Sequence, residues 1–172
     1  MAGSIEILRA QIETLGDYVS RETLSSSQIV KGLPRGAITQ ISGPGKTEFA
    51  VLFLKDHPEF NAAWIESIAS IYPCGILQRK VSLNRILFIE AGNEVPWVVG
   101  QVLKSGLFEV IILSSLVTDL KLLRRFQLAT EKAHAALILI SEIRSAAWPI
   151  ALQLESSRNQ KGQLKIEVIR ER

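Results

Sequence analysis

AITQISGPGKTEFAVLFLK, residues 37–55, is the stretch that decides the fold of this 172-residue chain. Its first six residues predict a strand, Gly43-Pro44-Gly45 predicts a tight turn, and Lys46 begins a helix that runs to about Lys55. A strand that passes through a glycine turn into a helix is the first half of a strand–helix–strand unit. The stretch therefore predicts an α/β protein.

Outward from this stretch, short apolar strands alternate with helices. The predicted strands are 62–67, 85–91, 108–114 and 135–141, the predicted helices are 72–80, 95–105 and 119–132, and residues 150–155 and 163–169 predict a hairpin around a turn at 159–162. The run 108–114 is nearly all apolar, as in a strand covered on both faces. The pattern predicts a doubly wound, mostly parallel sheet with helices on both faces, extended by antiparallel edge strands from the C-terminal hairpin.

The N-terminal region has a different pattern. Apolar residues recur there at helical spacing, at Ile5, Leu8, Ile12 and Leu15. They predict a short amphipathic helix over residues 4–16, and the serine-rich stretch 20–28 predicts a linker. We therefore divide the chain into a helix and linker, 1–28, and a core domain, 29–172. Because so short a helix is unstable alone, it either packs on its own domain or docks on a partner as an arm.

Composition narrows the functional classes. The net charge of +3, from 20 basic and 17 acidic residues, permits nucleic-acid contact without arguing for it. No apolar run approaches membrane-spanning length and residues 1–15 lack a signal-peptide core, so we expect a cytoplasmic protein without membrane contact. Cys74 is the single cysteine, which excludes an internal disulfide, and we expect it to be a buried or half-buried hydrophobe. His57 and His134 lack metal-ligand spacing, so no metal is expected.

The glycine turn carries the candidate binding residues, Gly43, Gly45, Lys46 and Thr47. A strand, a glycine turn and Lys-Thr at a helix start form the layout of a phosphate-binding loop, in which backbone N–H groups wrap the phosphates. The usual spacing is G-x-x-x-x-G-K-[ST], but here one residue separates the glycines, and Pro44 removes a donor. The turn could hold a lone anion, or it is simply a tight turn with a solvated lysine. We expect no nucleotide cofactor.

Several ordered segments resemble the RecA recombinase family. They are Gly32–Pro44, Trp64-Ile65-Glu66, Ser105–Ser115 and Ile140–Arg144. The first is similar to the family's entry into its first core strand and phosphate loop, and the third to its magnesium-site strand. The resemblance runs from about Lys31 to the C-terminus and implies a RecA-like fold.

The departures from that family imply a lost ATPase. The resemblance places Ser114 where the family has its magnesium-orienting aspartate, Ile68 where it has the catalytic glutamate, and Glu142 where a glutamine senses the γ-phosphate. A hydroxyl is a poor substitute for a carboxylate on a hard cation, and isoleucine activates no water. We therefore expect a pseudo-ATPase without catalytic residues. Glu66 and Glu142 are either a new acid/base pair or, the interpretation we favour, exposed carboxylates left on a former active face.

The expected DNA contact is weak or indirect. In the RecA family, long loops after the strands that end here at Ser115 and Arg144 grip single-stranded DNA. Here only residues 116–118 and 145–149 are available, and the second loop has no basic residue past Arg144. Trp148 could stack on a base or cover the edge of the core; we favour the second.

The nearest resemblance is to ImuA-like proteins, also described as SulA-like, which are accessory factors of bacterial damage-induced mutagenesis. It rests on residues 119–129 with their Leu-Arg-Arg, on Tyr72-Pro73 and on the ending 164–170. It implies a non-catalytic adaptor of the SOS response and of translesion synthesis. The implied partner is an error-prone polymerase-like protein or RecA, and homo-oligomerisation stays open.

Three other functions remain open at this point. The chain could be a SulA-like cell-division inhibitor that binds FtsZ, a minimal NTPase completed by a partner, or a small DNA-binding module. The helix over residues 119–132 also presents basic residues at Lys121, Arg124, Arg125 and Lys132. Such a face is either merely solvated or suited to an acidic protein.

Overall fold

A computed structural model describes residues 22–172, so the helix predicted over residues 4–16 lies outside the described residues. The elements are β1 (Thr23–Ser26), β2 (Ile29–Pro34), β3 (Ala37–Ser42), α2 (Lys46–Asp56), β4 (Ala62–Glu66), α3 (Pro73–Gln78), β5 (Ile86–Glu90), α4 (Val95–Ser105), β6 (Val110–Ser114), α5 (Leu120–Ala133), β7 (Ala136–Ile140), β8 (Ile150–Arg158) and β9 (Leu164–Glu171), with 3₁₀ turns at Leu83–Arg85 and Gly92–Glu94. Within this range, no helix is both long and apolar enough to cross a membrane.

The described residues form a seven-stranded sheet in the order β5-β4-β6-β7-β3-β8-β9. All neighbouring strands from β5 to β8 are parallel, and β9 is antiparallel to β8. The predicted doubly wound sheet with a C-terminal antiparallel hairpin is thus confirmed. The expectation of two antiparallel edge strands was wrong for β8, which pairs in parallel with β3. Residues 141–149 return the chain to the opposite end of the sheet before β8 begins.

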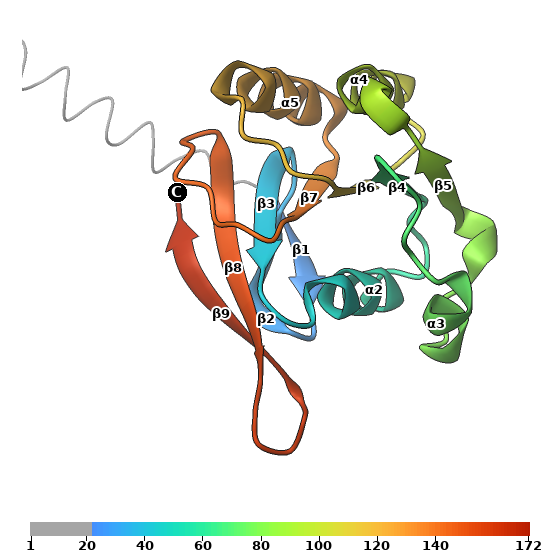
Figure 1. Ribbon diagram of the computed structural model, residues 1–172, viewed down its shortest axis with the longest axis vertical. Helices are drawn as coiled ribbons and strands as arrows, with labels where there is room; N and C mark the ends of the chain where they lie inside the picture. Colours follow the sequence, from blue (N-terminus) through green and yellow to red (C-terminus); the bar gives the residue numbers. More distant parts are fainter. Residues whose placement is uncertain (1–21) are drawn as a thin grey trace, which may run out of the picture.

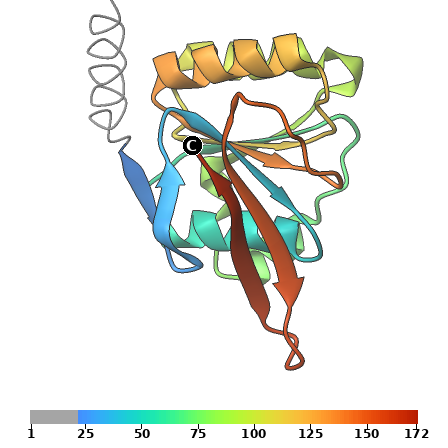
Figure 2. The ribbon, with the colours of Figure 1, turned by 90° about the vertical axis from the view of Figure 1, so that its left-hand side faces the viewer.

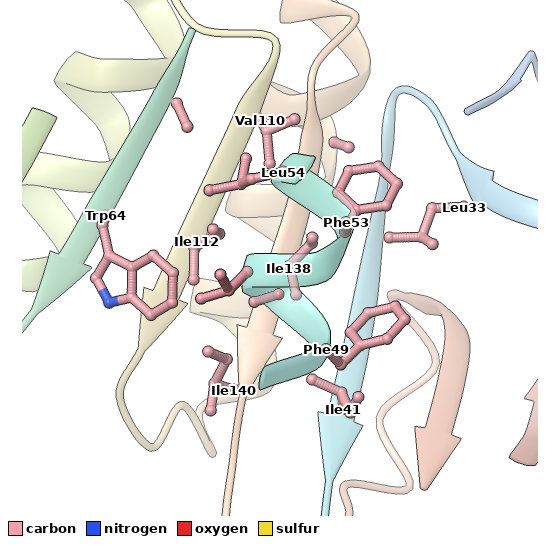
Figure 3. Close-up of a cluster of buried hydrophobic side chains, with 14 of the residues drawn as sticks. Leu33, Ile41, Phe49, Phe53, Leu54, Trp64, Val110, Ile112, Ile138 and Ile140 are labelled. Atoms are coloured by element: carbon pink, nitrogen blue, oxygen red, sulfur yellow. The ribbon is translucent and has the colours of Figure 1, made fainter. Parts of the chain in front are cut away.

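Helices cover both faces of the sheet, with α4 and α5 on one side and α2 and α3 on the other (Figure 1). On the α2 side, Phe49, Phe53 and Leu54 point into a core shared with Trp64 of β4 (Figure 3). A second core lies under α4 and α5. The central strands contribute buried side chains to both cores, which is why their sequences are apolar at nearly every position.

The N-terminal hairpin was missed, because residues 23–28 were interpreted as linker. They contain β1, which pairs antiparallel with β2 in a separate two-stranded sheet. Leu24 and Leu33 are buried against α2, while the serines between the apolar positions gave the stretch the composition of a linker. The hairpin contacts the C-terminal end of α2, where His57 Nε2 lies within hydrogen-bond distance, 2.8 Å, of the Ser25 carbonyl oxygen.

Cys74 is exposed, so the expectation of a buried or half-buried side chain was wrong. It lies on α3, a helix of six residues that buries only Ile76. One short helix presents one side to the core and leaves the other to solvent, and Cys74 falls on the solvent side.

Candidate functional site

The glycine turn, residues 43–45, lies directly against β8. Gly43 has φ 94°, and a Cβ atom there would lie 2.2 Å from the carbonyl oxygen of Ser156. The buried Ser156 hydroxyl also donates a 2.9 Å hydrogen bond to the Ser42 carbonyl. The backbone of β8 therefore occupies the space on that side of the turn, and no room remains there for a phosphate group.

Lys46 and Thr47 follow the turn but line different hollows. Lys46 lines a hollow of about 180 Å³ together with Glu142, and its Nζ lies 2.6 Å from Glu142 Oε1. Thr47 lines a separate pocket of about 390 Å³ between α2, α3 and the β8–β9 hairpin. A phosphate-binding loop needs the lysine and the hydroxyl on one ligand. The structure brings Gly43, Gly45, Lys46 and Thr47 to one turn, but it directs the last two side chains to different places.

The pocket beside Thr47 contains a closed ion-pair network. Glu48 accepts hydrogen bonds from Arg79, at 3.2 Å, and from Arg158 of the hairpin. Partial burial of Glu48 raises the pKa of its carboxyl, but the bonds to Arg158 and then Arg79 outweigh this and leave the pKa below its usual value. Both arginines of the pocket are thus paired with one carboxylate of the chain itself, which compensates one of their two positive charges.

Glu66 is buried at the end of β4, which corrects the expectation of an exposed carboxylate. It accepts hydrogen bonds from the Ser70 amide (2.7 Å) and hydroxyl (2.9 Å) and from the Ile71 amide (3.0 Å). A buried carboxylate is stable only with such donors, so Glu66 caps the loop that follows it. The side chain of Ile68, within this loop, is exposed.

Glu66 and Glu142 do not form an acid/base pair. Glu66 ends β4 and Glu142 follows β7, and β6 lies between these strands. Two strand spacings place their positions about 10 Å apart, and each carboxylate is bonded elsewhere. The exposed position expected for Glu142 is confirmed, since its side chain is 82% exposed.

Ser114 lies between the two hollows and lines both of them. It pairs in register with Glu66 on one side and with Ile140 on the other. Its neighbour Glu66 is the nearest carboxylate in the sheet register, and that carboxylate is already capped. Within residues 22–172, no three His, Cys, Asp or Glu side chains gather closely enough to hold a metal ion.

Two glutamines that shape this edge were missed by the sequence analysis. Gln40 of β3 donates to the Ile143 carbonyl (3.1 Å) and accepts from the Ser145 amide (3.0 Å). Gln153 of β8 donates to Gln40 Oε1 at 2.8 Å and also bonds to the Ser145 carbonyl. Together they fix the loop after β7. The signal was present, because a glutamine inside a strand that is buried on both faces must find hydrogen-bond partners inside the fold.

Trp148 has one ring face occupied by Arg124 and covers the edge of the core only in part. Its side chain is 47% exposed, and the Arg124 guanidinium lies 4.8 Å above the centre of its ring. The expectation that it would cover the core edge is therefore met only in part. A base would have to displace Arg124 to stack on that ring face.

Comparison with known proteins gives similarity in structure but none in sequence. No protein-family model matches the chain, and no curated protein matches it in sequence. Among solved structures, the RadB recombinase is similar with a TM-score of 0.64 and 17% identity, over 83% of this chain and 84% of that one. At this identity the similarity establishes the fold, which is RecA-like as predicted. The resemblance to ImuA-like and SulA-like proteins stays a prediction.

The contact between Gly43 and β8 predicts a position-specific loss of stability. Gly43→Ala adds a Cβ atom against the Ser156 oxygen at an unfavourable φ, and we expect it to lower the free energy of unfolding by about 3 kcal/mol or more. Gly162→Ala is the matched control, because φ there is 73° and no atom lies within 4 Å of the new Cβ. We expect about 1 kcal/mol for the control. Urea denaturation measures both, and equal losses would contradict the close contact.

The network at Glu48 predicts a pH-dependent contribution to stability. Since the folded pKa of Glu48 is lowered, its ion pairs stabilise the fold above the unfolded pKa of about 4.3. This contribution disappears as the pH falls through the folded pKa. The stability difference between wild type and Glu48→Gln should therefore be largest near neutral pH and shrink below about pH 4. Glu131→Gln is the control, because Glu131 is exposed and takes part in none of the ion pairs among residues 22–172, and it should change the stability little. A Glu48 difference that grows on acidification would refute this prediction.

Proposed function

We propose that this chain is a non-catalytic RecA-like adaptor that acts by protein–protein contacts. The observation that carries the proposal is the internal pairing of the charged groups beside the glycine turn. Lys46 is bonded to Glu142, both arginines of the neighbouring pocket are bonded to Glu48, and Glu66 caps its own loop. A nucleotide would have to replace these partners rather than meet free groups.

The backbone at the turn supports the same proposal. Triphosphate binding depends on successive N–H groups that surround the phosphates, and on a carboxylate that orients magnesium. Here Ser156 of β8 closes one side of the turn, and Ser114 stands where the resemblance implies an aspartate. A minimal NTPase completed by a partner is therefore disfavoured, because a partner in trans cannot lengthen the turn.

The biological setting rests on the resemblance to ImuA-like proteins. We place the adaptor in the bacterial SOS response, as an accessory factor of translesion synthesis. Its partner would be an error-prone polymerase-like protein or RecA. A SulA-like function, with FtsZ as the partner, is the second candidate and is distinguished by the experiments below.

The loss of nucleotide chemistry is testable with purified protein. We expect no phosphate release from ATP-magnesium above that of Lys46→Ala, and a melting temperature that is unchanged across millimolar nucleotide. A ligand at a hundred times its Kd would stabilise the fold by about 2.7 kcal/mol, which thermal melting detects readily. Nucleotide-dependent stabilisation or hydrolysis that Lys46→Ala abolishes would refute the non-catalytic proposal and favour the NTPase.

The adaptor role predicts a defined set of partners. Affinity capture with the tagged full chain, from cells before and after DNA damage, should enrich a polymerase-like protein or RecA in the damaged sample. Direct binding of the purified components then separates a contact from co-isolation. Recovery of FtsZ, with filamentous growth on expression, would contradict the adaptor function and support a function as a cell-division inhibitor.

A further inference from the structure

We propose that the outer face of α5 docks an acidic amphipathic helix of a partner protein. This inference rests on the proposed adaptor function, because it names the surface and the chemistry of the partner. The helix lies on the outside of the molecule, above the sheet (Figure 2). It therefore presents a continuous face that the described core does not cover.

The two faces of α5 are sharply different. Leu123, Phe126 and Thr130 are buried against the sheet and α4. The rest of the helix carries exposed residues at helical spacing: Leu120, Lys121, Arg125, Leu128, Glu131 and Lys132. The leucines in this second set are not core residues, since Leu120 and Leu128 are 47% and 49% exposed.

The cations of the outer face have no carboxylate partner in the described part of the chain. Lys121, Arg125 and Lys132 take part in none of the ion pairs among residues 22–172. Asp119 is used as the N-cap, where it accepts from the Lys121 amide at 2.9 Å. Glu131 is the one other carboxylate of the helix region, and it lies near the C-terminal end. The outer face thus has excess positive charge over its first two turns.

This arrangement opposes the stability of the isolated helix. The N-terminal end of a helix favours negative side chains, and Asp119 supplies one at the N-cap. The first turn itself has no acidic residue, however, and Lys121, Arg124 and Arg125 lie there and just beyond. Lys121 and Arg125 are also one turn apart, a spacing at which like charges destabilise a helix. An anionic partner relieves both effects, which is the reason to assign the face to binding rather than to helix stability.

The chemistry of the face favours a peptide over nucleic acid. Phosphate backbones would meet the cations but would leave Leu120 and Leu128 without apolar contacts. An amphipathic helix can place apolar side chains on the leucines and carboxylates on the cations. Lys121, Arg125 and Lys132 follow one line along α5, at positions i, i+4 and i+11, and span about 16 Å. Carboxylates at the same spacing on the partner match them.

Trp148 extends the apolar surface at the N-terminal end of α5. Arg124 stacks on its ring and donates to Gln127 at 2.7 Å. Arg124 is thus engaged within the chain, and we assign the electrostatic recognition to the other three cations. Leu120, one turn from Arg124, links this end to Leu128.

The test uses a designed probe and the full chain. A short stapled helical peptide carries leucines on one side and glutamates at the i, i+4 and i+11 spacing, with a fluorescent label for anisotropy. We expect it to bind with an affinity that falls with salt. Neutralisation of three cations, Lys121→Gln/Arg125→Gln/Lys132→Gln, should weaken binding about tenfold or more. Leu128→Ser should weaken it without a change in charge.

Matched controls separate this surface from general charge attraction. Lys55→Gln/Lys161→Gln/Lys165→Gln removes the same charge from exposed positions elsewhere, and should change the affinity less than about twofold. The same peptide with glutamines in place of glutamates should bind at least about tenfold more weakly. Equal affinity for both peptides, equal effects of the two triple variants, or no binding at all would overturn the proposal.

Two other occupants of the outer face of α5 would give different results in this test. A labelled single-stranded thymidine oligonucleotide that binds the α5 cations, and that the peptide does not displace, would assign the face to nucleic acid. The variant Leu8→Glu/Ile12→Glu removes two apolar residues from the N-terminal segment of the chain. If the peptide binds this variant but not the wild type, the N-terminal segment itself is the occupant of the face. Both results overturn the proposal. The nucleotide assays above are independent of α5, so a failure here leaves the non-catalytic proposal standing, and the converse also holds.

Discussion

The arrangement of the loops at the carboxyl edge of the sheet depends on the position of β3. This strand is buried on both faces and hydrogen-bonded along both sides. It lies between β7 and β8, and each of its six residues is buried. The chain that leaves β3 must therefore turn at once, against the backbone of β8, before α2 can begin. Gln40 within β3 also finds its partners in the loop after β7, so the same strand positions that loop.

The polar groups at this edge are satisfied by the chain itself. A buried carboxylate or a partly buried lysine is costly without a partner, and both have one here: the 66–71 loop encloses Glu66, and Glu142 meets Lys46. Because these polar groups are paired within the chain, the carboxyl edge of the sheet is stable without a ligand. The positive face of α5 is the contrast, because its charges have no such compensation in the described part of the chain.

Much of the fold was predictable because burial on both faces produces unbroken apolar runs. The predicted bounds of β3 and α4 agree with the structure, and those of most other elements are close. The β1–β2 hairpin was missed because serines separate its few buried apolar residues. The direction of β8 was also beyond the pattern, since alternation with period two is the same for parallel and antiparallel strands.

The sequence alone determined the order of strands and helices from β3 onward, the shortened glycine turn, and the residue types at the positions where the RecA resemblance implies catalytic groups. These are local properties, set by neighbours within a few positions. Tertiary structure decided which groups meet. Lys46 and Glu142 are 96 positions apart, and Lys46 and Thr47 are adjacent yet face different hollows. Such relations depend on strand order and on the side of the helix that each residue occupies, and these are established only when the sheet assembles.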